Sequence, residues 1–131
     1  MKRQFDFWRD HSDTFLTMAY LWDRRKAMPQ PDGYATKRGD CGDTITIYLA
    51  LQNAQISAIT FELEGCMHTN ACCNALAVLV EGKTVSQAWE ITPKDIIEFL
   101  ETLPIDHHHC AELTVGTFYL ALANCSIGYG K

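Results

Sequence analysis

The sequence predicts an α+β domain in which a small antiparallel sheet of about three strands is covered on one face by helices. Three observations carry this prediction. Residues 44–51 alternate between apolar and polar side chains, and residues 58–64 repeat the alternation after a short polar turn. Farther along the chain, apolar residues recur every three or four positions, which is typical of helices that pack on a sheet.

The N-terminal part of the chain, residues 1–32, is predicted to be a helical extension. Apolar side chains recur at helical spacing between residues 10 and 27. Pro29 and Pro31 end this pattern. Residues 29–40 are dense in proline, glycine and aspartate, so this segment is predicted to be a loop.

Aromatic side chains are unusually frequent in this N-terminal region. Such residues ordinarily pack in a core, whereas an exposed apolar patch would indicate a partner surface or a homodimer contact. We expect partial exposure. The residues concerned are Phe5, Phe7, Trp8, Phe15, Tyr20 and Trp22.

Two strands are predicted from strict alternation. Ile45 and Ile47 point to one side of the first strand, and Ile59 and Phe61 repeat the pattern in the second. Residues 52–55 form a polar turn between them. The two strands are therefore expected to pair as an antiparallel hairpin with one covered face.

Helices are predicted over the rest of the chain. Gly65 breaks the second strand. Thr92 and Pro93 combine a capping side chain with a proline at the first helical position. The last helix begins near His108 or His109. The predicted helices cover residues 67–82, 84–91, 93–103 and 108–125.

Length and charge limit the classes of function. The chain of 131 residues suffices for one domain with its own core, and residues 1–131 are treated as a single domain. The formal net charge of −5 argues against nucleic acid as a partner. No apolar run reaches the ~18–20 residues that span a bilayer, and no secretory signal is recognised. We therefore expect a cytoplasmic protein that has no membrane partner.

Six cysteines are many for a reducing compartment, where free thiols point to metal or sulfur chemistry. The absence of a Cys-x-x-Cys pair argues against a zinc ribbon or a thioredoxin-type motif. Cys41 precedes the first predicted strand, and Cys66 follows the second. These two ends of a hairpin share one edge of the sheet, so the two thiols are predicted neighbours.

A third thiol, Cys110, falls in the first turn of the last helix, where the helix dipole is expected to lower its pKa. If that helix begins at the same sheet edge, Asp43 and His109 join the three cysteines Cys41, Cys66 and Cys110. Such a set suits tetrahedral zinc or an iron–sulfur cluster. The alternative is that these cysteines are buried small hydrophobes, and that Asp43 caps a turn.

The remaining cysteines and histidines are assigned structural or solvent roles. Two of the cysteines are adjacent, so on a helix they point about 100° apart and at most one can face the site. The histidine after Cys66 could be an alternative ligand, but exposure on the helix surface is expected. The residues given these roles are Cys72, Cys73 and Cys125 in the core, and His68, His107 and His108 toward solvent.

Several motifs follow one another in an order that resembles the iron–sulfur cluster assembly scaffold family, which comprises the NifU N-terminal domain and IscU-like proteins. They are GDCGDT around Cys41, EGC ending at Cys66, then GKT and ITPKDI, and finally LPIDHHHCAEL around Cys110. The resemblance covers residues 33–124 and implies a SufE/NifU-like fold.

By this resemblance the protein is a non-enzymatic scaffold. It would take sulfur as persulfide from a cysteine desulfurase, build a labile [2Fe–2S] cluster with iron, and transfer the cluster to apo iron–sulfur acceptor proteins. Zn²⁺ is an alternative occupant of the same pocket. The implied ligands are Cys41, Asp43, Cys66 and Cys110, with His109 beside the last cysteine. Cys110 is interpreted as the first persulfide acceptor.

The chain departs from the family pattern in several places. Its N-terminal region lacks the usual His-Tyr and Asn-Pro-Arg sequences, so that pattern does not support desulfurase docking there. Residues 103–107 read LPIDH in place of LPPVK, which argues against a dedicated Hsp70 chaperone partner. The spacing from Cys66 to Cys110 leaves no room for the SufU insertion. This favours a scaffold over the alternative, a zinc-binding SufU-like sulfurtransferase; a zinc or iron sensor is a third hypothesis.

Overall fold

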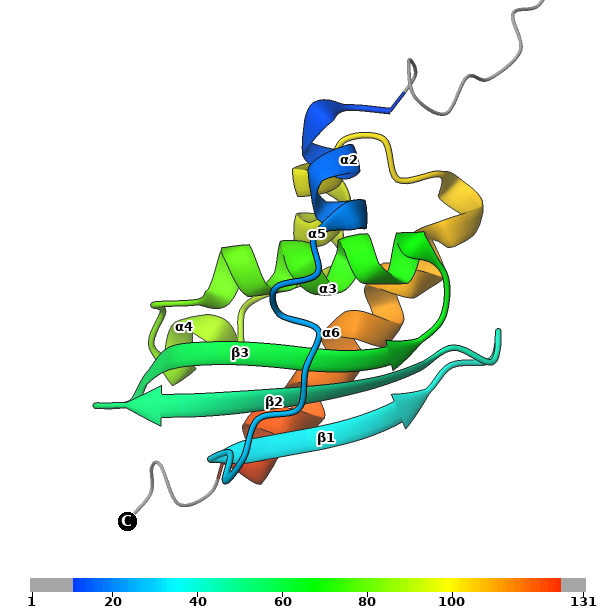
Figure 1. Cartoon of the computed structure of the whole chain (residues 1–131). Coiled ribbons are helices and arrows are strands. Elements are labelled where there is room, and N and C mark those ends of the chain that lie inside the picture. The colour runs from blue at the N-terminus through cyan, green and yellow to red at the C-terminus, as the bar shows by residue number, and fades with distance from the viewer. Residues whose placement is uncertain (1–10, 126–131) are drawn as a thin grey trace, which may run out of the picture.

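The computed structural model describes residues 11–125, which contain one three-stranded antiparallel sheet and a set of helices (Figure 1). The sheet has the order β1-β2-β3, so neighbours in sequence are neighbours in space. The predicted fold class is confirmed. The elements are α2 (Asp13–Tyr20), β1 (Gly33–Arg38), β2 (Thr44–Gln52), β3 (Gln55–Glu64), α3 (Met67–Val80), α4 (Val85–Ala88), α5 (Pro93–Leu100), η1 (Ile105–His107) and α6 (His108–Asn124).

The hairpin of β2 and β3 follows directly from the alternating sequence. The two strands pair from Thr44 opposite Glu64 to the short turn at the other end. Asn53 and Ala54 form this turn with φ values of 55° and 63°. Positive φ at both residues matches the twist of a two-residue hairpin connection. The open end of the hairpin therefore brings the segments before β2 and after β3 to one sheet edge.

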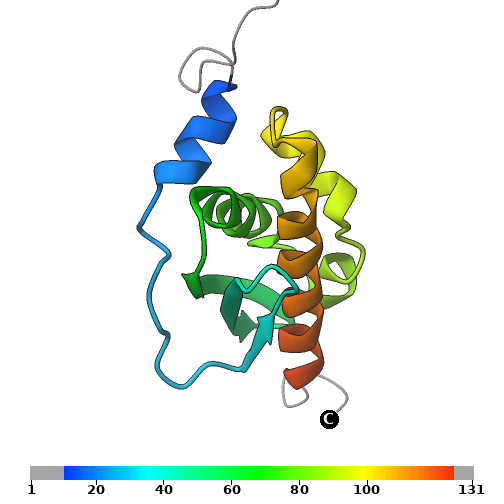
Figure 2. The same ribbon diagram turned by 90° about the vertical axis from the view of Figure 1, so that its right-hand side faces the viewer.

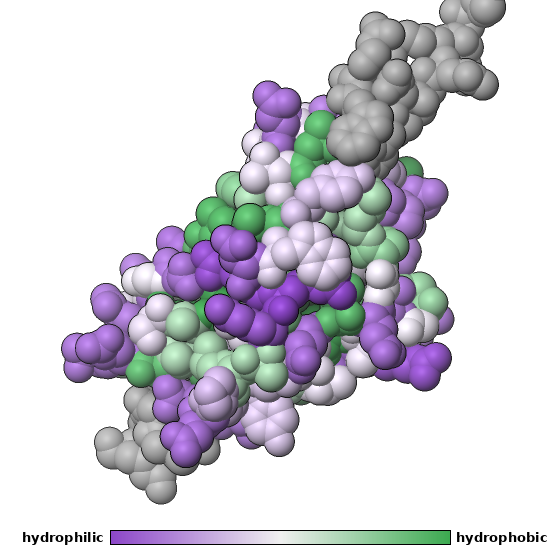
Figure 3. Space-filling view, in the orientation of Figure 1, coloured by the Kyte–Doolittle hydropathy of each residue, from purple (hydrophilic) through white to green (hydrophobic). Residues whose placement is uncertain are grey.

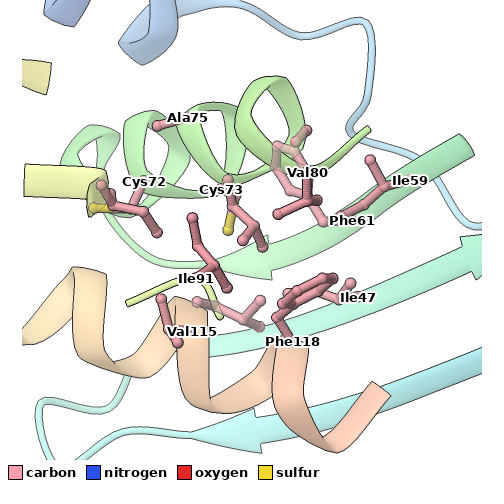
Figure 4. Packing of buried hydrophobic residues seen from close by; sticks show 14 of the residues in the cluster. Ile47, Ile59, Phe61, Cys72, Cys73, Ala75, Val80, Ile91, Val115 and Phe118 are labelled. Carbon is pink, nitrogen blue, oxygen red and sulfur yellow. The ribbon is translucent and has the colours of Figure 1, made fainter. Parts of the chain in front are cut away.

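Helices α3 and α6 pack with the sheet around one core (Figures 1 and 2). Figure 4 shows side chains of β2 and β3 meeting those of the two helices, with Ile47 and Phe61 from the sheet, Val80 from α3 and Phe118 from α6. Each of these four is at most 1% exposed. Full burial of such a side chain contributes about 1.5–3 kcal/mol. This layer fixes where α3 and α6 begin relative to the hairpin.

Helix α2 is shorter than predicted, because side chains of α3 bind the carbonyl groups at its C-terminal end. The buried side-chain amides of Asn70 and Asn74 donate hydrogen bonds to carbonyls there. Those carbonyls are the groups that a helix end leaves without partners. The chain then runs extended beside β3, where the amide N–H of Phe61 donates to the carbonyl of Arg24 at 2.9 Å.

The prediction of a loop over residues 29–40 is wrong, because β1 lies within that segment. β1 pairs with β2 along its whole length, beginning with Gly33 opposite Leu49. Most of its side chains are exposed, so it lacks the apolar alternation that marks the other strands. A Cβ at Gly33 would lie 2.3 Å from Sγ of Cys125. Glycine therefore allows the end of α6 to pack directly on this strand.

The remaining helices are confirmed, with earlier ends than predicted. Helix α3 stops at Val80, just before Gly82, whose φ is +89°. Helix α5 begins with a capping box in which the Thr92 hydroxyl accepts from the backbone N–H of Asp95 while the Asp95 carboxylate accepts from the N–H of Thr92. None of the helices between residues 11 and 125 is both long and apolar enough to cross a membrane.

The N-terminal aromatic residues divide between core and surface. Phe15 is fully buried, whereas Tyr20 and Trp22 are 44% and 60% exposed. Figure 3 shows the face that carries the segment between α2 and β1, where polar and apolar side chains are intermixed. The expectation of partial exposure is therefore confirmed for the residues that can be checked. Phe5, Phe7 and Trp8 lie outside the described residues.

Candidate metal centre

The candidate site lies at the open end of the β2–β3 hairpin, where α3 also begins. Asp43 directly precedes β2, and Gly65 and Cys66 directly follow β3. A Cβ at Gly65 would lie 2.8 Å from Oδ2 of Asp43. Glycine at this position thus lets the carboxylate lie against the backbone at the start of α3. The pairing of Thr44 with Glu64 confirms that the two hairpin ends share one sheet edge. The predicted neighbour of Cys66, the Cys41 thiol, is not among the grouped ligand atoms found between residues 11 and 125.

Two cysteines and a histidine converge at this edge. One ligand atom from each of Cys66, His107 and Cys110 lies within 4.8 Å of the other two. Cys66 is the N-cap residue of α3 and His107 is the N-cap residue of α6. His107 and Cys110 are three residues apart, a spacing that puts both on one face of a helix. The two helix starts therefore supply the cluster between them (Figure 1).

The spacing of these atoms suits a metal ion after a small contraction. Zinc binds sulfur at about 2.3 Å and imidazole nitrogen at about 2.0–2.1 Å, so neighbouring donors of a tetrahedral site lie roughly 3.5–3.8 Å apart. The observed limit of 4.8 Å between Cys66, His107 and Cys110 is only about 1 Å wider. Side-chain rotation alone can cover such a difference. Thiolate and imidazole donors also match zinc and iron–sulfur chemistry.

The hydroxyl of Thr69 connects the carboxylate to the thiols. Thr69 is fully buried in the first turn of α3, and its Oγ1 donates to Oδ2 of Asp43 at 2.6 Å. The same oxygen lies 3.5 Å from Sγ of Cys110 and 3.7 Å from Sγ of Cys66. Asp43 is thereby held at the wall of the site. Sequence reasoning missed Thr69, although its position three residues after Cys66 on a helix was a usable signal.

The other residues predicted for the site lie around this cluster. His109 is close, with Nε2 at 3.7 Å from Sγ of Cys110. Cys41 is exposed on the turn before β2, and it lines a groove of about 500 Å³ together with His109, Lys37 and Glu112. The structure therefore brings Asp43, Cys66, His109 and Cys110 together and leaves Cys41 at the rim.

Two histidines that were expected to be solvated belong to the centre. His68 and His107 are half-buried, and their rings stack with centroids 3.7 Å apart and an angle of 9°. Nδ1 of His68 lies 3.5 Å from Sγ of Cys66. The expectation of solvated histidines is wrong here, because the beginnings of α3 and α6 pack against each other. His108 instead turns toward Leu103, with Nε2 at 3.1 Å from that residue's carbonyl oxygen.

The expected lowering of the Cys110 pKa is also wrong. Cys110 is only 1% exposed, and burial raises the pKa of its thiol to about 11. The nearby Thr69 hydroxyl opposes this rise, whereas Cys66 and Asp43 reinforce it. Desolvation of the Cys110 thiol therefore raises its pKa by more than the helix dipole lowers it. Burial also lowers the pKa of His68 to about 4, with His107 and His11 adding to the effect.

The other cysteines lie in the core, as expected. Cys72 and Cys73 are at most 1% exposed, and Cys73 points into the layer between α3 and the sheet (Figure 4). Burial raises the pKa of Cys73 to about 12. Cys125 is fully buried at the end of α6 beside Gly33. None of these three thiols is among the grouped ligand atoms found between residues 11 and 125.

Comparison with known proteins identifies the family. Residues 29–126 match the model of the NifU-like N terminal domain. The chain is 31% identical over 91 residues to the iron–sulfur cluster assembly scaffold protein IscU 1 of Archaeoglobus fulgidus, covering 70% of this chain and 60% of that protein. It is 32% identical over 93 residues to the scaffold protein IscU of Aquifex aeolicus, covering 70% and 59%. The matched segment thus spans about three fifths of these relatives.

Solved structures share the fold. A protein described as a SUF-system iron–sulfur cluster assembly scaffold, from Fervidobacterium islandicum, superposes with a TM-score of 0.71 at 21% identity, covering 85% of this chain and 95% of that one. The N-terminal part of a NifU-like protein from Brucella abortus gives 0.72 at 18% identity, covering 88% and 94%. From the family match and the curated relatives, we conclude that the chain belongs to the NifU N-terminal domain and IscU-like family of iron–sulfur cluster assembly scaffolds.

Proposed function

We propose that this protein is a scaffold on which a labile [2Fe–2S] cluster is assembled and then passed on. Sulfur comes from a cysteine desulfurase, iron enters at the same site, and apo iron–sulfur proteins receive the cluster. The observation that carries this proposal is the convergence of Cys66 and Cys110 with a histidine within 4.8 Å, beside a carboxylate tied in through Thr69. We place the protein in the cytoplasm and propose no catalytic turnover of its own.

The cluster ligands in this proposal are Cys41, Cys66 and Cys110 as thiolates, with Asp43 as the carboxylate ligand and His109 beside the last cysteine. Thiolates are the ordinary ligands of iron–sulfur clusters. Cys41 must move inward from an exposed turn. That turn carries Gly42 at φ +95°, and its N–H donates to the carbonyl of Gly39 at 3.0 Å. Such a tight glycine turn allows a local change of conformation without disturbing β2.

Sulfur delivery is a thiol exchange reaction. A scaffold thiolate attacks the outer sulfur of the desulfurase persulfide, the sulfur–sulfur bond of the donor breaks, and the donor cysteine leaves as thiolate. Conversion of the transferred sulfur to sulfide then takes electrons from an external donor. Attack requires access and thiolate character. Both are poor at Cys110 in this conformation, because it is 1% exposed with a pKa of about 11.

This geometry moves the proposed first acceptor from Cys110 to Cys41. Cys41 is exposed and opens onto the groove beside His109. Cys110 then receives sulfur from within the site as the cluster forms. Mass mapping of persulfide on peptides after brief incubation with desulfurase and cysteine tests this order. Label that appears first on Cys110 would restore the original assignment.

A zinc-binding sulfurtransferase of SufU type is the second candidate function. One feature favours it, the compact group of candidate zinc ligands from Cys66, His107 and Cys110. In that case zinc would stay bound, and adding the protein would raise the turnover of the desulfurase. The dedicated Hsp70 partner remains outside both proposals, because residues 103–107 read LPIDH.

Anaerobic assembly followed by transfer separates the two candidates. The protein is incubated with iron, cysteine and a catalytic amount of desulfurase, then mixed with an apo-ferredoxin. A scaffold develops thiolate-to-iron charge-transfer absorption, and the ferredoxin gains its cluster faster than with free iron and sulfide. The Cys66→Ser protein is the negative control. If the wild type gains no cluster absorption while desulfurase turnover rises with zinc retained, the scaffold proposal fails.

A further inference from the structure

We infer that the strap between α2 and β1, residues 21–32, forms a binding groove with β3 and the end of α3. Its ligand is a small zwitterion with an apolar body, of the amino-acid or dipeptide class. The inference goes beyond the proposed function, because the groove lies away from the thiols. Ile59 lines the groove, whereas β3 reaches the thiol site at Glu64. About 17 Å of extended chain separates these two residues.

The strap is anchored at both of its ends. Near α2, the N–H of Phe61 donates to the carbonyl of Arg24 at 2.9 Å. The guanidinium of Arg24 also donates to both carboxylate oxygens of Glu81, at 2.8 and 3.0 Å. Near β1, the carboxylate of Asp32 accepts from the N–H of Leu51 at 2.6 Å. Figure 2 shows the strap arching outside the sheet between these anchors. The outer wall of the groove is therefore held in place before any ligand arrives.

The groove has the size and lining of a small-molecule site. Its volume is about 650 Å³. Ligand pockets ordinarily measure about 300–1,000 Å³ and combine a mostly apolar lining with a few polar groups. The apolar lining comes from both the strap and β3, and it consists of Leu21, Ala27, Met28, Pro29, Ala58 and Ile59.

Thr60 adds a buried hydroxyl to this lining. Its side chain is 9% exposed, and its Oγ1 has no hydrogen-bond partner among residues 11–125. A buried hydroxyl without a partner costs free energy. Valine has nearly the same shape and suits a strand, so it would fill this position without that cost. A ligand with a polar group at this oxygen would supply the missing partner.

The charges of the groove select the class of ligand. Arg24 and Lys26 are basic, and Asp23 and Glu81 are acidic. Their formal charges cancel, so the groove offers no net attraction to a phosphate or to a polyamine. Charges of both signs beside an apolar lining instead complement a molecule with a carboxylate, an ammonium group and an apolar side chain.

Part of the groove lies outside the segment that matches the family. The match begins at residue 29, whereas residues 21–28 supply most of the strap side of the groove. The thiol site lies wholly inside the matched segment. The groove is therefore a feature of this chain's own N-terminal region, and its ligand class follows from the residues that line it.

Titration of the full-length, reduced protein with L-leucyl-L-leucine tests the inference, with amide NMR signals as the readout. The dipeptide should give saturable shifts at Ala27, Ala58 and Thr60, and none at Cys41 or His109. The neutral N-acetyl dipeptide amide keeps the apolar body and loses both charges, so it should bind at least about tenfold more weakly. The absence of saturable shifts overturns the inference. Equal binding of the neutral analogue overturns the assigned ligand class.

Thr60→Val gives a second readout that a purely structural role would not produce. The change removes the hydroxyl without a partner, so the melting temperature of the ligand-free protein should rise. The affinity for the dipeptide should fall by about tenfold or more. A Thr60→Val protein that binds the dipeptide as tightly as the wild type overturns the inference.

Thr46→Val is the matched control. Thr46 lies on the same face of the sheet, but its hydroxyl is paired with that of Thr36 at 2.7 Å. This change should leave the melting temperature unraised and the dipeptide affinity within about twofold of the wild type, because Thr46 does not line the groove. An equal loss of affinity in Thr46→Val and Thr60→Val would contradict the placement of the ligand.

Ala58→Leu tests the position of the ligand from the opposite direction, because the larger side chain fills the groove. A folded Ala58→Leu protein should show no saturable shifts with the dipeptide. Retained binding in this variant overturns the inference. Cluster assembly is scored separately in the same variants, so a failure of the scaffold proposal and a failure of the groove are distinguishable.

Discussion

The Thr69 hydroxyl donates a hydrogen bond of 2.6 Å to Oδ2 of Asp43. Thr69 is fully buried, and the same hydroxyl oxygen lies within 3.7 Å of both Cys66 and Cys110 sulfurs. One side chain from α3 thus sets the position of the carboxylate relative to the thiols. In the proposed cluster site, Asp43 would have to leave this hydrogen bond to bind a metal.

Replacing Thr69 by valine tests this relationship. The isosteric Thr69→Val change removes the hydrogen bond to a charged group and should lower the free energy of unfolding by about 1–3 kcal/mol. Thr69→Ser keeps the hydroxyl and should recover most of the loss. Urea denaturation of the zinc-free protein measures both. In an Asp43→Ala background, Thr69→Val should lower the free energy of unfolding by clearly less. An equal loss of stability in both backgrounds would show that Thr69 and Asp43 are not energetically coupled.

Asp43→Ala tests the role of the carboxylate in cluster release. A carboxylate is a harder and weaker ligand for iron than a thiolate, so its removal should lengthen the cluster lifetime and slow transfer to an apo-ferredoxin. The decay of charge-transfer absorption and the rate of ferredoxin loading measure the two effects. A lifetime equal to that of the wild type would exclude Asp43 from the release step.

Serine substitutions separate ligand cysteines from core cysteines. Cys66→Ser removes a thiol that belongs both to the proposed cluster ligands and to the Cys66, His107 and Cys110 group, and it should abolish stable metal binding. Cys125→Ser changes a fully buried thiol at the far end of α6 and should lower stability while leaving metal binding intact. Metal content after gel filtration, together with thermal unfolding, distinguishes the outcomes. Retention of metal by Cys66→Ser at wild-type stoichiometry would contradict the account.

The buried thiols predict how stability depends on pH. Burial raises the pKa of Cys73 from 9.0 to about 12. The native state therefore keeps a proton that the unfolded chain loses above pH 9, so this contribution is complete below about pH 9 and is lost as pH rises toward 12. The slope from one such group is about 1.4 kcal/mol per pH unit.

Urea denaturation of reduced, metal-free protein across the alkaline range measures this slope. The free energy of unfolding should fall as pH rises above 9, because a thiol in the unfolded chain has an ordinary pKa of 9.0. Cys73→Ala removes the titrating group. The free energy of unfolding of this variant should therefore fall less steeply with pH, by the contribution of one thiol. Parallel curves for the two proteins would show that Cys73 does not titrate differently in the two states.

The sequence predicts the hairpin of β2 and β3, because the alternation of apolar and polar side chains is a local property of each strand. The alternating side chains of β2 and β3 fixed their pairing, and this pairing brings Asp43 and Cys66 to one edge. Residues 33–38 carry no such pattern, since β1 is an exposed strand whose conformation depends on pairing with β2.

The parts of the site that were missed depend on contacts between distant segments. His68 and His107 are separated by most of α3 through α5, and they stack only because two helices begin side by side. The pKa of Cys110 likewise depends on burial by neighbours from other elements, which outweighs the local effect of its helix start. No local spacing rule contains this information.

Mössbauer spectroscopy of the protein after anaerobic, desulfurase-driven loading with iron tests the central claim most directly. The account predicts the spectrum of a [2Fe–2S] cluster in the wild type, and its loss in Cys66→Ser. A spectrum containing only mononuclear or unbound iron, with desulfurase active and the protein folded, would contradict the proposal that this site assembles clusters.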